Sequence, residues 1–193
     1  MQIIDDILTL EEADHIERTI INDRFPWFIQ AGDGTVTPDI AEIYENDNNV
    51  KDHFQFVHDS IVWNNTLQTF YKSKYSKLCQ KTLDRFMQRT GYANWESYDI
   101  LRSKINLTPQ YKNAKYGHSV PHTDDKEPHM VIIYYVNDSD GDTCIFDNEG
   151  KVQHRISPKK GRFLVFDGNR KHAGSHPYHA NYRVVINGNI RFK

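Results

Sequence analysis

The 193-residue sequence has few cysteines, no long apolar run and no excess of basic residues. Its two cysteines, Cys79 and Cys144, lie far apart, which argues against a disulfide framework and favours buried thiols in a reducing compartment. No apolar stretch reaches the length of a membrane span, and the first residues lack the features of a secretion signal. A formal charge of −2 provides no global basic field for nucleic acid or an anionic membrane. We therefore expect a cytoplasmic protein that binds neither nucleic acid nor membrane.

The composition is that of a folded chain. Hydrophobic residues make up 38% of the sequence and charged residues 26%, a balance typical of a globular protein with a packed core. The length favours one domain over two. We expect a single domain over residues 1–193, with helical support over about residues 1–97 and a β-rich core over about residues 98–193.

The first half of the chain carries mainly helical signals. Thr9 and Glu12 have the spacing of a capping box, and apolar residues at near-helical spacing follow to about Asn22. Residues 60–90 have a second apolar face, for which we expect two helices, and Gly91 is suited to end the last one. Residues 25–29 predict an extended segment, with a turn at residues 32–34 and mostly loop up to residue 49.

The second half changes to short runs of β-branched and aromatic residues separated by turns. The expected strands are residues 98–107, 129–136, 143–146, 152–156, 163–166 and 182–190. Several short strands at this spacing favour a sandwich or a closed antiparallel barrel with the helices packed outside it.

One set of residues in this half has the chemistry of a metal site. Side chains two residues apart in an extended segment project to the same side, so His122 and Asp124 can both reach one metal ion. His172 follows a strand and turn at residues 161–168. Two imidazoles and one carboxylate form a facial triad that leaves three positions open on Fe(II) for a 2-oxo acid and O₂. Arg183, which interrupts an apolar run, can pair with the far carboxylate of 2-oxoglutarate.

Other candidates compete for these roles. His176 and His179 follow His172 closely, but one precedes a proline in an expected loop and the other lies too near Arg183. The spacing of the motif favours Asp124 over Asp125 as the carboxylate ligand.

Taken as an ordered set, these features resemble the 2-oxoglutarate/Fe(II)-dependent oxygenases, particularly the prolyl-hydroxylase-like branch and its compact phage-encoded members. The resemblance covers residues 98–192. It implies a mainly β fold with N-terminal α-helices and a double-stranded β-helix (jelly-roll) core. It also implies His122, Asp124 and His172 as catalytic iron ligands, and Arg183 and Tyr134 as residues that bind the distal carboxylate of 2-oxoglutarate. For Tyr134 a plain core position is the alternative. The cofactors are then Fe(II) with 2-oxoglutarate and O₂ as co-substrates, and ascorbate is an additional candidate.

The sequence departs from this family at two positions and leaves alternatives open. Val185 replaces a small hydroxyl residue, and Thr108 stands where relatives often have tyrosine, so both bear on co-substrate binding. The expected activity is hydroxylation of a C–H bond in a prolyl or other peptidyl residue, or in a small molecule, in the host cytoplasm if the chain is phage-encoded. The alternatives are a cupin-like metal-binding jelly roll with other chemistry and a catalytically silent binding module.

Overall fold

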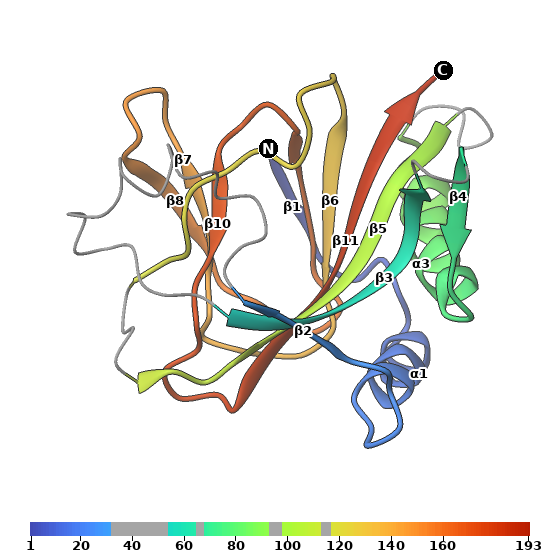
Figure 1. Cartoon of the computed structure of the whole chain (residues 1–193), viewed down its shortest axis with the longest axis horizontal. Coiled ribbons are helices and arrows are strands. Elements are labelled where there is room, and N and C mark those ends of the chain that lie inside the picture. The colour runs from blue at the N-terminus through green and yellow to red at the C-terminus, as the bar shows by residue number, and fades with distance from the viewer. Residues whose placement is uncertain (32–53, 65–67, 93–97, 113–116) are drawn as a thin grey trace.

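The computed structural model describes residues 1–31, 54–64, 68–92, 98–112 and 117–193. Within these ranges the chain forms two β-sheets and two helices (Figure 1). In chain order the elements are β1 (Gln2–Ile4), α1 (Leu10–Ile20), β2 (Phe28–Ala31), β3 (Phe54–Asn64), β4 (Thr69–Lys72), α3 (Ser76–Thr90), β5 (Tyr98–Pro109), β6 (Met130–Tyr135), β7 (Thr143–Phe146), β8 (Val152–Ile156), β9 (Phe163–Asp167), β10 (His172–Gly174) and β11 (Tyr182–Phe192).

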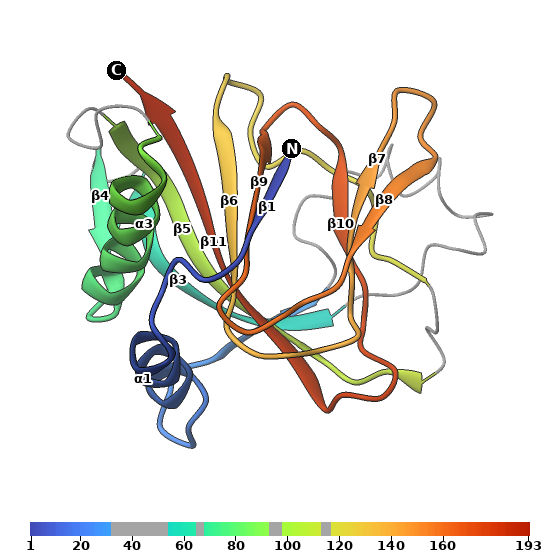
Figure 2. The ribbon, with the colours of Figure 1, turned by 180° about the vertical axis from the view of Figure 1, so that it is seen from behind.

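The larger sheet has the strand order β1-β9-β6-β11-β5-β3-β2, with β4 paired to β3, and the smaller sheet has the order β10-β7-β8. All the strand pairs are antiparallel. The two views show both helices on one side of the larger sheet and the smaller sheet on the other (Figures 1 and 2). This is the expected double-stranded β-helix with helices buttressing one face.

Strand alternation divides the apolar residues of the larger sheet between two cores. On β6, Ile132 and Tyr134 belong to the core that includes helix residues such as Leu83, whereas Ile133 and Tyr135 belong to the core between the two sheets. The inner face of the larger sheet is therefore the one that meets the smaller sheet, and this is where a jelly roll places its site.

The two helices have the sequence signals expected of them. Thr9 caps α1, accepting a hydrogen bond from the Glu12 N–H, and the Glu12 carboxylate accepts one from the Thr9 N–H. Helix α3 ends at Gly91, which has φ 62° and so occupies the left-handed region that glycine tolerates best. The helices pack closely on the sheet: a Cβ built on Gly188 of β11 would lie 2.8 Å from a Leu83 methyl carbon.

The expectation of two helices over residues 60–90 is wrong in its first half. The chain there forms β3 and β4, which pair with each other, and β3 also pairs with β5. Short apolar runs fit both the helical and the strand period, and pairing along β5 favours the strand. The turn expected at residues 32–34 and the loop up to residue 49 lie outside the described residues.

The N-terminal segment is joined to the core. Strand β1 extends the larger sheet at β9, and Arg162 donates two hydrogen bonds to the Asp5 carboxylate, at 2.8 and 3.0 Å. Both cysteines are buried and free, as expected. Neither of the helices in the described residues is long and apolar enough to span a membrane.

Candidate metal and co-substrate site

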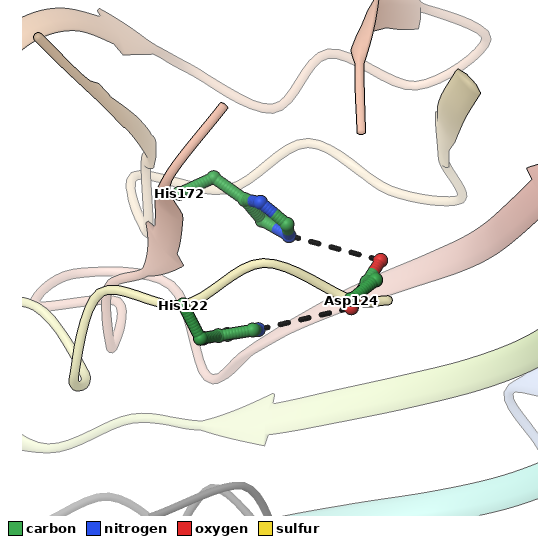
Figure 3. Close-up of side chains that lie close together, drawn as sticks. All are labelled: His122, Asp124 and His172. Carbon is green, nitrogen blue, oxygen red and sulfur yellow. Dashed lines mark ion pairs between the residues drawn. The ribbon is translucent and has the colours of Figure 1, made fainter. Parts of the chain in front are cut away.

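His122, Asp124 and His172 lie together, although Asp124 and His172 are 48 positions apart in the chain (Figure 3). One ligand atom from each side chain lies within 4.8 Å of those of the other two. The Nε2 atoms of His122 and His172 are each 3.8 Å from an Asp124 carboxylate oxygen. The backbones of the two histidines form an antiparallel bridge, with reciprocal N–H to carbonyl bonds of 3.0 and 2.9 Å. This bridge brings the first and last ligands side by side.

Both imidazoles are oriented to present Nε2 to the centre of the group. His122 Nδ1 lies 3.0 Å from the Val120 carbonyl oxygen, and His172 Nδ1 lies 3.2 Å from the Arg170 carbonyl oxygen. A carbonyl only accepts hydrogen bonds, so each Nδ1 carries the proton and each Nε2 keeps its lone pair for a metal. Burial lowers the pKa of His172 to about 4, which keeps this imidazole neutral at physiological pH.

Asp124 is held from the other side by two residues of the larger sheet. Arg102 of β5 donates to Oδ1 at 2.7 Å and Asn187 of β11 donates to Oδ2 at 3.0 Å. Burial alone would raise the pKa of the Asp124 carboxyl, but the charge of Arg102, with smaller effects from both histidines and Asn187, holds it well below its usual range. Asp124 is therefore an ionised, fixed ligand.

The triad opens into a cavity of about 140 Å³ between the two sheets. Liquid water occupies about 30 Å³ per molecule, so the space admits a small organic molecule. Arg183 and Thr143 line this cavity together with the triad. Arg183 is 5% exposed and donates to Thr143 Oγ1 at 2.7 Å. Its Nε is buried with no hydrogen-bond partner, and within the described residues no carboxylate forms an ion pair with it.

Tyr134 does not lie in this cavity, so the expectation that it binds the co-substrate needs correction. Its ring packs on Phe163 in the helix-side core at a centroid distance of 4.9 Å, and its hydroxyl is buried without a hydrogen-bond partner. The next residue, Tyr135, has the opposite orientation. Its ring lies 5.7 Å from the Arg183 guanidinium carbon, and its hydroxyl donates to Thr143 at 2.7 Å. A shift of one residue along a strand reverses the face.

The competing residues lie outside the triad. His176 is buried, with Nδ1 2.8 Å from the Pro109 carbonyl oxygen, and His179 is exposed. Asp125 is exposed, and its side chain accepts a hydrogen bond from the Glu127 N–H. His118 is also buried, at 4% exposed. None of these four residues belongs to the metal-binding group.

The two positions that depart from the family both line the cavity. Thr108 and Val185 are 1% and 2% exposed. They belong to adjacent paired strands, β5 and β11. The sequence analysis did not predict Thr143, Arg102 and Lys104 as cavity residues, nor Tyr135 as the residue that donates to Thr143. For Arg102 and Lys104 a signal was available, because alternate residues of β5 share one face.

Comparison with known proteins agrees with this geometry. Residues 109–191 match the family model described as the 2OG-Fe(II) oxygenase superfamily. This match covers less than half of the chain, and it includes the His-Asp-His group and most strands of the jelly-roll core. Solved structures with this fold include one described as having nickel and 2-oxoglutarate bound and another described as a non-heme alpha-ketoglutarate-dependent epimerase. No curated protein sequence matches the chain.

Solved structures share the fold at low sequence identity. An oxidoreductase of the 2OG-Fe(II) oxygenase family from Burkholderia pseudomallei is 13% identical, with a TM-score of 0.63, over 94% of this chain and 78% of that one. A Trichoplax adhaerens prolyl hydroxylase in complex with a hypoxia-inducible-factor peptide is 16% identical, with a TM-score of 0.62, over 98% and 82%. A viral collagen prolyl hydroxylase from Paramecium Bursaria Chlorella virus-1 is 15% identical, with a TM-score of 0.53, over 100% and 96%.

The residues present fit Fe(II) and 2-oxoglutarate. Two imidazoles and a carboxylate are the donor set of a non-haem Fe(II) site with open positions. The buried Arg183, whose Nε lacks a partner, fits the distal carboxylate of the 2-oxo acid. The Thr143 oxygen already accepts hydrogen bonds from Arg183 and Tyr135, so its own proton is free to donate to the same carboxylate.

Proposed function

We propose that the protein is an Fe(II)- and 2-oxoglutarate-dependent dioxygenase that hydroxylates a C–H bond, with His122, Asp124 and His172 as the iron ligands. The observation that carries this proposal is the convergence of the three ligand atoms beside a buried arginine that has no carboxylate partner in the described residues. A cupin-like enzyme of other chemistry would need the metal ligands but not Arg183.

The chain's own residues have separate tasks in this reaction. Fe(II) with 2-oxoglutarate supplies the O₂ activation that oxidises the substrate carbon. Arg183 and Thr143 would bind the far end of the co-substrate and so orient its 2-oxo acid end toward the three ligands. Arg102 and Asn187 keep the Asp124 carboxylate ionised and fixed. The side chains of Asp124 and His172 are buried between the two sheets, which limits their contact with water.

A prolyl or other peptidyl residue is the substrate that the resemblance suggested, and two of the structural neighbours are described as prolyl hydroxylases. These similarities are below 25% identity, so for this chain a peptidyl substrate is part of the proposal.

Anaerobic titration of the metal-free protein with Fe(II) and 2-oxoglutarate tests the site. We expect a weak visible charge-transfer band that is absent in Asp124→Ala and requires at least tenfold more 2-oxoglutarate in Arg183→Ala and Arg183→Lys. Arg191→Ala is the matched control, because this arginine belongs to the same strand but is exposed. Bound metal without a band would refute the 2-oxoglutarate assignment and favour the cupin-like or silent alternatives.

A further inference from the structure

The cavity has an excess of positive charge. Among the described residues, three cationic side chains line it, Arg102, Lys104 and Arg183, and one carboxylate, Asp124. Bound Fe(II) and dianionic 2-oxoglutarate cancel each other's charge. Of the three cations, Arg183 is assigned above to the co-substrate. The positive charge on the β5 side of the cavity therefore remains when metal and co-substrate are bound.

Lys104 is the cation without a charged partner. Its ammonium donates to the neutral amide oxygen of Gln30 at 2.6 Å, and within the described residues it forms no ion pair. Asp59 lies opposite it in the β3–β5 ladder without an ion-pair contact. Burial lowers the pKa of the Lys104 ammonium, and the charge of Asp59 acts in the opposite direction. A half-buried cation with a neutral partner is suited to an anion supplied by a ligand.

Arg102 lies on the same β5 side of the cavity as Lys104, next to the metal ligands. One of its terminal nitrogens binds Asp124, while its Nε is buried without a hydrogen-bond partner. Asn106 lies two positions after Lys104 in β5 and so on the same face of the strand. Its buried side-chain oxygen also lacks a partner. Arg102 Nε can donate to an oxygen of a ligand, whereas Asn106 Oδ1 can accept from a donor elsewhere on the same ligand. An apolar substrate ring would leave both atoms unsatisfied.

On the basis of the proposed oxygenase function, we propose that the substrate carries a carboxylate that binds Lys104, with Arg102 beside it, on the β5 side of the cavity. The carboxylate would hold the oxidised carbon of the substrate over the metal ligands. It belongs either to a small free acid or to an acidic residue of a peptide, and both present the same group to Lys104.

Probe binding next to the metal tests this proposal. The Fe(II)-loaded protein is saturated with 2-oxoglutarate under argon, and paramagnetic broadening of the probe's proton resonances is compared with the Zn(II)-loaded protein. The first pair of probes is N-acetylglycine and N-acetylglycinamide. The second pair is the blocked tripeptides Gly-Asp-Gly and Gly-Asn-Gly. We expect an acid of at least one pair to bind at least tenfold more tightly than its amide, and the pair that discriminates identifies the source.

Lys104→Gln should remove this preference and Lys104→Arg should retain it. Lys81→Gln is the matched control, since it removes the same charge from the exposed surface of α3. Equal binding of acids and amides, or an unchanged preference in Lys104→Gln, would overturn the proposal. If the charge-transfer band is absent, the proposed function fails separately. Calorimetric binding of the acids to the Zn(II) protein then still decides whether Lys104 binds carboxylates.

Discussion

Asn187 shows how a residue that does not itself belong to the metal-binding group can control the metal. Its amide nitrogen fixes one oxygen of Asp124, and partners of this kind typically contribute 10- to 100-fold in metal affinity. We expect Asn187→Ala to weaken Fe(II) binding by about that factor in competition with a chelator. Asn189→Ala, in the same strand but outside the cavity, is the matched control. Equal affinities in the two variants would show that this hydrogen bond does not orient the ligand.

Tyr134 and Tyr135 form a matched pair of adjacent positions on opposite faces of β6. Tyr135→Phe removes the hydroxyl that holds Thr143 beside Arg183, at a cost of about 1 kcal/mol, which corresponds to about a fivefold rise in the dissociation constant of 2-oxoglutarate. Tyr134→Phe removes a hydroxyl with no partner, so the affinity should not change. Titration of the charge-transfer band measures both. A larger effect at Tyr134 would contradict this assignment of faces.

Between elements, the contact of α3 with β11 depends on one glycine. An added Cβ on Gly188 would lie 2.8 Å from the fully buried Leu83 side chain. We expect Gly188→Ala to destabilise the fold by about 1–3 kcal/mol through overpacking. Chemical denaturation measures the loss, and adding Leu83→Ala should make the glycine substitution less costly than it is alone. Strictly additive effects in the double variant would argue against a direct clash.

The attachment of β1 to the core has an electrostatic component that depends on pH. Asp5, held by Arg162 through two side-chain hydrogen bonds, has a pKa below its ordinary value of 3.8. Its contribution to the free energy of unfolding is therefore fully present above about pH 4 and is lost as the pH falls through the folded-state value. We expect Asp5→Asn to cost about 0.5–1 kcal/mol at pH 7, since the pair is partly exposed.

The difference between wild type and Asp5→Asn should shrink steadily as denaturation is repeated from pH 5 to pH 2. A constant difference over that range would mean that the substitution acts through packing and not through the charge of the carboxylate.

For the molecule as a whole, metal binding should stabilise the fold because the ligands lie where the two sheets meet. Fe(II) at 100 times its dissociation constant adds about 2.7 kcal/mol, which raises the melting temperature by about 5–10 °C for a chain of this size. A chelator should reverse the shift, and Asp124→Ala should show none. Amide hydrogen exchange should slow at β10, whose backbone pairs with that of His122. An equal shift in Asp124→Ala would place the metal elsewhere.

The whole-molecule architecture could largely be predicted from the sequence. Strands β7 and β8 have the expected bounds because short β-branched runs stand between strong turn signals. Strand β3 was missed because its apolar spacing also fits a helix, and only the pairing with β5 decides between them. His122 and Asp124 could be predicted as a metal motif because side chains two residues apart in an extended segment project to the same side. The prediction that Tyr134 binds the co-substrate was wrong because no local signal shows which face of β6 meets the smaller sheet.

The backbone bridge between His122 and His172 has a consequence for how the site could change over time. Main-chain groups alone form this bridge, so the separation of the two α-carbons does not require imidazole at either position. Substitution of either residue by aspartate or cysteine would change the donor atom without moving its anchor point. Metal preference in this scaffold is thus open to stepwise evolution or design, one donor at a time.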